Sequence, residues 1–171
     1  TGVVTFGGYE GEAAPHHITL RHITFLASLT GRATTMSSPS TDHAIYFEQA
    51  VGGPHDLLLE DIAVDGTGGL ASALQFYHSD AANQNAWNVT VRRLTVSGTQ
   101  QAIILWDQTL HDITIEDSTI SGTTRFAVRY EDPGQNIILK NITSTGSGQQ
   151  GFYSSLGPNP PGVTFSDNSF R

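Results

Sequence analysis

The chain has 171 residues, 37% of them apolar, a net charge of −8 at pH 7 and no cysteine. This length supports one well-buried core, so we expect a single domain over residues 1–171. The negative charge opposes binding to nucleic acid and to anionic membranes. The sequence contains no run of about 18 apolar residues, so we expect no membrane-spanning helix. The lack of cysteine excludes a disulfide framework and thiolate metal sites.

One pattern recurs along the chain, in which an apolar-x-apolar triplet, a polar or charged pair and a second such triplet follow one another. Copies occupy residues 17–25, 56–64 and 88–96, and later copies begin at Asp112, Asn136 and Gly162. Counted from Val89, successive copies are spaced by 24, 24 and 26 residues. The period-two alternation within each triplet predicts β-strands, and the regular spacing indicates a repeat architecture.

A further strand is predicted between successive copies, where a small residue precedes alternating apolar positions. These segments are residues 2–6, 44–48, 73–77, 102–106, 127–131 and 151–155. Each repeat therefore contains three predicted strands. If the repeats stack at the usual strand spacing of roughly 4.8 Å, equivalent residues form columns along the molecule.

The polar pair between the two triplets carries charges in an ordered way. The pairs are Arg21-His22, Glu60-Asp61, Arg92-Arg93, Glu116-Asp117 and Lys140-Asn141. The first member alternates in sign from copy to copy, so stacking would create an ion-pair ladder. We interpret this ladder as a device that holds the strands in register. Asparagines such as Asn88, Asn136 and Asn168 are expected to favour turns and left-handed conformations.

These repeats, which cover essentially the whole chain, resemble the pectin-lyase-like superfamily. The resemblance implies an all-β, single-stranded right-handed parallel β-helix with about six coils of three strands. The resemblance does not specify an activity, because similar scaffolds carry polysaccharide lyases, glycoside hydrolases, uronan epimerases, esterases, phage tailspikes and non-catalytic proteins. We expect a secreted or extracellular carbohydrate-active protein. No end cap is visible in the sequence, so we expect an excised part of a longer solenoid, or ends that a neighbouring chain covers.

The predicted third strands carry most of the reactive side chains. Their outward positions are expected to form two columns, which are Val4, Tyr46, Gln75, Ile104, Arg129 and Tyr153, and then Phe6, Glu48, Tyr77, Trp106, Glu131 and Ser155. Aromatic rings interrupted by carboxylates and an arginine are typical of a sugar-binding cleft. The predicted substrate-binding residues are Tyr46, Gln75, Tyr77, Trp106, Tyr153 and His78.

Three catalytic hypotheses follow from these residues. In a lyase, Arg129 would abstract the proton, and Asp80, Asp107 and Asp132 would hold calcium. In a glycoside hydrolase, two of the carboxylates of Glu48, Asp107 and Glu131 would flank the scissile bond. In an epimerase, His55 would be the base.

Each hypothesis has a structural alternative. Arg129 stands two residues before Glu131, where a salt bridge is expected. Turn aspartates commonly cap turns. The His55-Asp56 pair recurs as His111-Asp112, which favours a structural role for both pairs.

The sequence thus leaves three functions open. The first is binding of an extended polysaccharide along the third strands, with or without cleavage. The second is a structural module that self-associates end to end. The third is ice binding through the predicted threonine columns, which Leu58, Ala63 and Ile138 interrupt.

Overall fold

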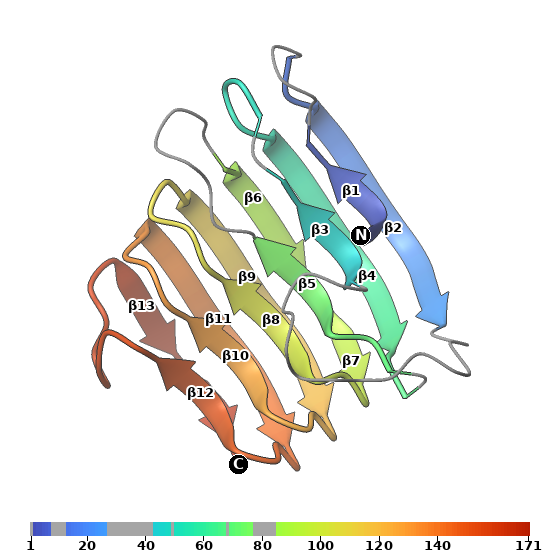
Figure 1. The fold of residues 1–171 in the computed structure, drawn as a ribbon, viewed down its shortest axis with the longest axis vertical. Coiled ribbons are helices and arrows are strands. Elements are labelled where there is room, and N and C mark those ends of the chain that lie inside the picture. Colours follow the sequence, from blue (N-terminus) through green and yellow to red (C-terminus); the bar gives the residue numbers. More distant parts are fainter. Residues whose placement is uncertain (1, 8–12, 27–42, 49, 68, 77–84) are drawn as a thin grey trace.

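The computed structural model describes residues 2–7, 13–26, 43–48, 50–67, 69–76 and 85–171. Within these residues the secondary structure is all β, and no helix long and apolar enough to cross a membrane is found. The strands form two parallel sheets, one with six strands and one with eight (Figure 1). We call them the short-strand sheet and the long-strand sheet.

The short-strand sheet is built from segments of five residues each. In sheet order they are β1 (Gly2–Phe6), β3 (His43–Phe47), β5 (Ser72–Phe76), β8 (Gln101–Leu105), β10 (Phe126–Tyr130) and β12 (Gln150–Ser154). All neighbouring pairs are parallel. This order matches the segments predicted as third strands.

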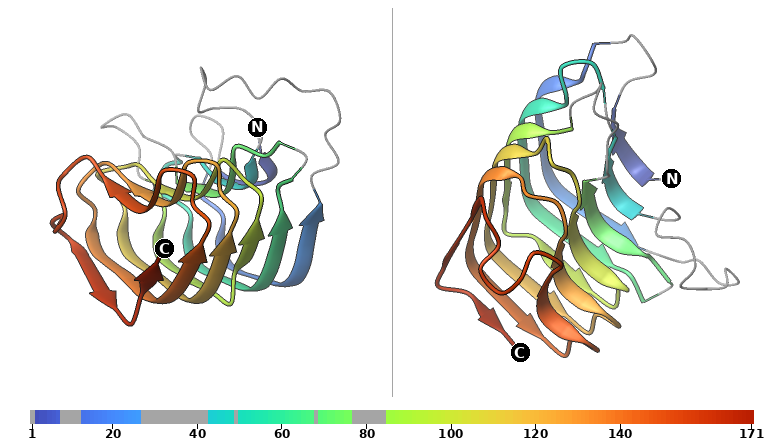
Figure 2. Two further views of the ribbon diagram at one scale, coloured as in Figure 1. Left: turned by 90° about the horizontal axis from the view of Figure 1, so that it is seen from below. Right: turned by 60° about the vertical axis from the view of Figure 1, so that its left-hand side comes forward.

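The long-strand sheet contains the repeated pattern. Its strands are β2 (His16–Leu26), β4 (His55–Asp65), β6 (Trp87–Arg92), β7 (Thr95–Ser97), β9 (His111–Ser121), β11 (Gln135–Thr145), β13 (Val163–Ser166) and β14 (Ser169–Phe170). Among the described residues, strands that are consecutive in the chain do not pair with each other. Between one repeat and the next the chain passes through the short-strand sheet, whereas β6 and β7, like β13 and β14, follow one another within the long-strand sheet (Figure 2). Parallel strands arranged in this way are compatible with a parallel β-solenoid.

The two triplets of the repeat were expected to be separate strands, but four copies form continuous strands of 11 residues. A single left-handed residue joins the two triplets. These residues are His22, Asp61, Asp117 and Asn141, and their φ angles lie between 49° and 55°. One such residue turns the chain while the ladder hydrogen bonds continue on both sides. Asn88, Asn136 and Asn141 adopt the predicted left-handed conformation, whereas at the last repeat Asp167 adopts it instead of Asn168.

The register of the long-strand sheet confirms the predicted columns. Thr19, Leu58, Thr90, Thr114, Ile138 and Thr164 pair in series, as do Thr24, Ala63, Thr95, Thr119, Thr143 and Ser169. The charged column is also present. Glu60 pairs in register with Arg21 and Arg92, and the corresponding ion pairs are both 2.8 Å long.

The predicted register of β1 is wrong by one residue. Thr5 pairs with Tyr46 and Phe6 pairs with Phe47, so Thr5 takes the outward position that was predicted for Val4. Phe6 is only 4% exposed and stacks on Phe47 with ring centroids 5.0 Å apart. The run of apolar residues in this strand permits either register by pattern alone, and the aromatic packing in the core decides it.

The core lies between the two sheets and contains residues from both of them. Phe47 stacks on Phe76 at 4.3 Å and thereby continues the stack from Phe6. Tyr130 also belongs to this core and is fully buried. Its hydroxyl donates to the Pro161 carbonyl at 3.0 Å and accepts from the Gly134 amide at 2.7 Å, which fixes the turns that follow β10 and β12.

Candidate functional site

Most of the described candidate residues lie in the strands of the short-strand sheet or directly after them, whereas His55 belongs to the long-strand sheet. One column is formed by residues that pair in register from strand to strand, in the order Tyr46, Gln75, Ile104, Arg129 and Tyr153. Glu48, Trp106 and Glu131 follow the ends of their strands and extend the hydrogen-bonding pattern through their backbone amides. Tyr77, His78 and Asp80 lie outside the described residues.

The best-defined cluster is formed by Trp106, Arg129 and Glu131. The Arg129 guanidinium carbon lies 5.3 Å from the centroid of the Trp106 ring, and Nη2 donates to Glu131 Oε1 at 2.7 Å. Nη1 also approaches Gln101 Oε1 at 3.5 Å. The Arg129 and Glu131 side chains are 15% and 17% exposed, so both remain accessible at the surface. The cluster therefore combines an aromatic ring with a charged donor and a charged acceptor.

A second aromatic cluster lies beside it on the next strands. The Phe126 and Tyr153 rings stack with centroids 4.7 Å apart and an interplanar angle of 18°. The Arg125 guanidinium carbon lies 5.1 Å from the Phe126 centroid. Phe126 is buried and Tyr153 is partly exposed, so Tyr153 presents this cluster to solvent.

Gln75 was predicted to bind substrate, but its side chain is not exposed at all. Neither amide atom of Gln75 has a hydrogen-bond partner in the structure as described. Ile104, its neighbour in the column, is also buried. Strand alternation predicts the direction of a side chain and gives no information about what covers it, so the sequence could not reveal this burial.

Asp107 was predicted both as a catalytic carboxylate and as a calcium ligand. It is fully buried, and Oδ1 accepts from the amide of Thr109 at 2.6 Å and from its hydroxyl at 2.7 Å. Asn85 approaches Oδ2 at 3.4 Å. Asp107 thus has the contacts of a turn-stabilising aspartate.

Asp132 is partly exposed in the turn after β10, where its carbonyl accepts from the amide of Gly134 at 2.9 Å. Among the residues that the structure describes, no group of three or more His, Cys, Asp or Glu side chains is arranged to hold a metal ion. Asp80, the third predicted calcium ligand, lies outside these residues, so calcium binding stays a prediction.

The sequence pattern did not reveal a column of stacked rings at one edge of the long-strand sheet. His16 stacks on His55 at 5.0 Å, His55 on Trp87 at 4.3 Å, and Trp87 on His111 at 5.6 Å, with interplanar angles of 17°, 4° and 13°. Each ring directly precedes a left-handed residue of the repeat. Alignment of the repeats one residue further toward the N-terminus would have exposed this column.

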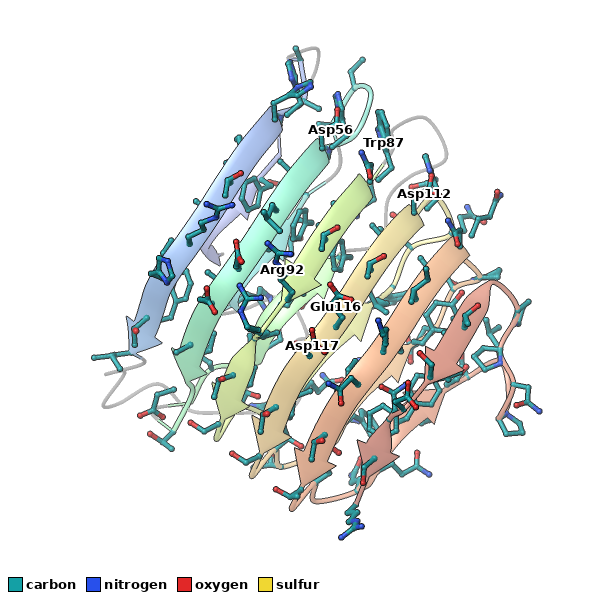
Figure 3. All side chains as sticks on the ribbon, turned by 180° about the vertical axis from the view of Figure 1, so that it is seen from behind. Asp56, Trp87, Arg92, Asp112, Glu116 and Asp117 are labelled. Carbon is teal, nitrogen blue, oxygen red and sulfur yellow. The ribbon has the colours of Figure 1, made fainter. Side chains whose placement is uncertain are left out.

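The stacked column places His55 in a structural setting. Its Nδ1 donates to the Gly53 carbonyl at 2.9 Å, and the Trp87 indole donates to the Gly52 carbonyl at 2.8 Å. His55 is also covered on its faces by the rings of His16 and Trp87. These contacts agree with the structural alternative to the epimerase hypothesis. Figure 3 shows Trp87 between Asp56 and Asp112 at this edge.

The clearest pKa shifts also lie on the long-strand sheet. Burial acts to raise the pKa of Glu60, but the hydrogen bond from Arg93 and the charges of Arg92, Arg21 and Arg93 outweigh it, so this pKa is lowered. A hydrogen bond from Arg93 likewise lowers the pKa of Asp61. Figure 3 shows Arg92 near Glu116 and Asp117 in the middle of this charged surface. The shifts arise from the ladder and mark structural ion pairs.

Three comparisons with known proteins give no relative for this chain. No protein-family model, no curated protein and no solved structure matches it.

Proposed function

We propose that the chain is a right-handed parallel β-helix of about six coils, similar to the pectin-lyase-like proteins, and that it binds an extended polysaccharide. The binding surface is the part of the outer side of the short-strand sheet that carries Trp106, Arg129, Glu131 and Tyr153. The observation that carries this proposal is the cluster in which the Arg129 guanidinium lies over Trp106 and pairs with Glu131. Rings and fixed polar groups of this kind suit sugars, whose faces are apolar and whose hydroxyls need donors and acceptors.

The direction of the surface supports an extended ligand. Trp106 follows β8 and Glu131 follows β10, which are adjacent in the sheet, and Tyr153 belongs to β12 on the far side of β10. Adjacent strands repeat about every 4.8 Å. A polymer that crosses β8, β10 and β12 therefore meets Trp106, Glu131 and Tyr153 in succession.

Binding without cleavage is favoured over hydrolysis. Among the candidate carboxylates, Asp107 is buried in a turn, which leaves Glu48 and Glu131. Glu48 follows β3 and Glu131 follows β10, and these strands are three steps apart in the sheet. Three steps span about 14 Å, which exceeds the roughly 5–9.5 Å separation of carboxylates in glycoside hydrolases.

Cleavage by a lyase mechanism is also disfavoured. A general base must be able to accept a proton from the substrate near neutral pH. The Arg129 guanidinium instead donates to the Glu131 carboxylate at 2.7 Å, so it is engaged in a salt bridge. We therefore assign Arg129 a binding role.

The test is equilibrium binding of neutral and acidic oligosaccharides to the folded chain, with product analysis for cleavage. Arg129→Ala and Trp106→Ala should each weaken binding by about tenfold or more. The matched control is Arg92→Ala, which removes a guanidinium that is ion-paired to Glu60 at 2.8 Å on the other sheet. Unchanged affinity in both test variants, or an equal loss in the control, would contradict the proposal.

A further inference from the structure

The two faces of the molecule differ in how their cations are used. Arg21, Arg92, Arg93 and Lys140 all lie on the long-strand sheet, where each one contacts a carboxylate of the ladder. These side chains are remote from the proposed binding face, because they project from the other sheet. They are therefore not placed to neutralise a ligand on the short-strand sheet.

The proposed binding face offers little positive charge of its own. Its described cations are Arg125, which lies over Phe126, and Arg129, which is paired with Glu131. Glu48 adds an exposed carboxylate on the same side. The chain as a whole carries a charge of −8, so the summed field repels polyanions as well.

We infer that the polysaccharide bound by this face is neutral, with hydroxyl groups and without carboxylate or sulfate groups. This inference rests on the proposed function. A uronate carboxylate would have to displace Glu131 from Arg129, at the cost of leaving one carboxylate unpaired in a partly buried site. Neutral hydroxyls can use the pair as it stands, because Arg129 donates and Glu131 accepts.

The first experiment measures binding of xylan or β-glucan oligosaccharides and of oligogalacturonates of equal length to the wild-type chain. It is run at about 0.02 M and about 0.5 M salt, which bracket strong and weak charge effects. We expect the neutral ligand to bind with less than about a twofold change between the two salts. We expect the oligogalacturonate to bind at least about tenfold more weakly at low salt. Tighter binding of the oligogalacturonate, weakened by salt, overturns this inference alone, whereas binding of neither ligand overturns the proposed function as well.

The second experiment changes the charge on each face by the same amount. Glu131→Gln leaves Arg129 without its partner, and Glu116→Gln makes the same substitution beside Lys140 on the long-strand sheet. The ratio of oligogalacturonate affinity to neutral affinity at low salt should rise by about tenfold in Glu131→Gln and by less than about twofold in Glu116→Gln. An unchanged ratio in Glu131→Gln, or equal changes in both variants, overturns the inference. The salt dependence of the wild type decides the question if Glu131→Gln fails to fold.

Discussion

The Arg129 guanidinium donates to the Glu131 carboxylate at 2.7 Å, although the two residues are only two positions apart in the chain. They lie on the same side of the sheet because strand side chains alternate, and both are less than one fifth exposed. Arg129, which was one predicted catalytic base, is therefore part of an ion pair whose net charge is zero.

We predict that the pair is energetically coupled. A double-mutant cycle with Arg129→Met and Glu131→Gln should give a coupling energy of about 1 kcal/mol, because the pair is partly shielded from water. Methionine keeps an apolar stem over Trp106 and removes the charge. The measurement is urea unfolding of the wild type, both single variants and the double variant. Strict additivity would show that the two groups do not interact in solution.

Substitution of Gln75 by leucine should stabilise the fold. The Gln75 amide is fully buried without a hydrogen-bond partner among the described residues, and an unsatisfied buried polar group costs about 1–3 kcal/mol. Thermal or urea unfolding should therefore show a gain of about that size. The control is Gln135→Leu, an exposed position at the start of β11, which should change stability by less than about 0.5 kcal/mol. A loss of stability in Gln75→Leu would mean that the amide has a partner in solution.

Removal of the Tyr130 hydroxyl should destabilise the fold. Tyr130→Phe removes both hydrogen bonds, but the Gly134 amide still donates to the Asp132 carbonyl and Pro161 is exposed, so the cost should be about 0.5–1.5 kcal/mol. Burial, together with the charge of Asp132, raises the pKa of Tyr130 despite the hydrogen bond from Gly134, so the hydroxyl remains neutral above its usual range. Tyr153→Phe serves as the control for the loss of a partly exposed hydroxyl and should leave stability within about 0.5 kcal/mol. Equal stability of Tyr130→Phe and the wild type would refute the assignment.

Acid should weaken the ion-pair ladder. The pKa values of Glu60 and Asp61 are lowered from their ordinary values of 4.5 and 3.8. Groups with a depressed folded-state pKa stabilise the fold above their ordinary pKa, and this stability is lost as the pH falls toward the folded-state value. The free energy of unfolding should therefore decline below about pH 4.5, as urea titrations at several pH values can measure.

Arg93→Gln tests the source of this pH dependence. Arg93 hydrogen-bonds to both Glu60 and Asp61, so its loss should bring their pKa values closer to ordinary and flatten the decline below pH 4.5. The same slope in the variant and the wild type would show that other groups set the acid limit.

The repeat spacing was sufficient to predict much of the fold. The parallel all-β arrangement, the positions of the short strands and the columns of Thr19 and Thr24 all follow from a period of two within a longer repeat. The register of β1 could not be predicted, because Val3, Val4 and Phe6 offer two apolar phases and only core packing selects one. The continuity of the long strands also escaped prediction, since a single left-handed residue can turn a strand without ending it.

The candidate site was less predictable than the fold. Sequence reasoning placed Arg129, Glu131 and Tyr153 on one face and expected the Arg129–Glu131 salt bridge. It could not foresee that Gln75 and Asp107 are buried, because burial at an outward position depends on neighbouring segments rather than on the alternation itself. The ring column of His55 and Trp87 was missed because the repeats were aligned on their apolar triplets.

The chain has two tryptophans, Trp87 in β6 of the long-strand sheet and Trp106 directly after β8 of the short-strand sheet, and this gives a direct test of the central claim. The measurement is an NMR titration of the two indole N–H signals with a neutral oligosaccharide, with assignments from Trp87→Phe and Trp106→Phe. We predict that the Trp106 signal shifts with saturation, and that the Trp87 signal, whose indole donates to the Gly52 carbonyl at 2.8 Å, stays in place. A saturating shift of Trp87 with no change at Trp106 would contradict a binding face on the short-strand sheet.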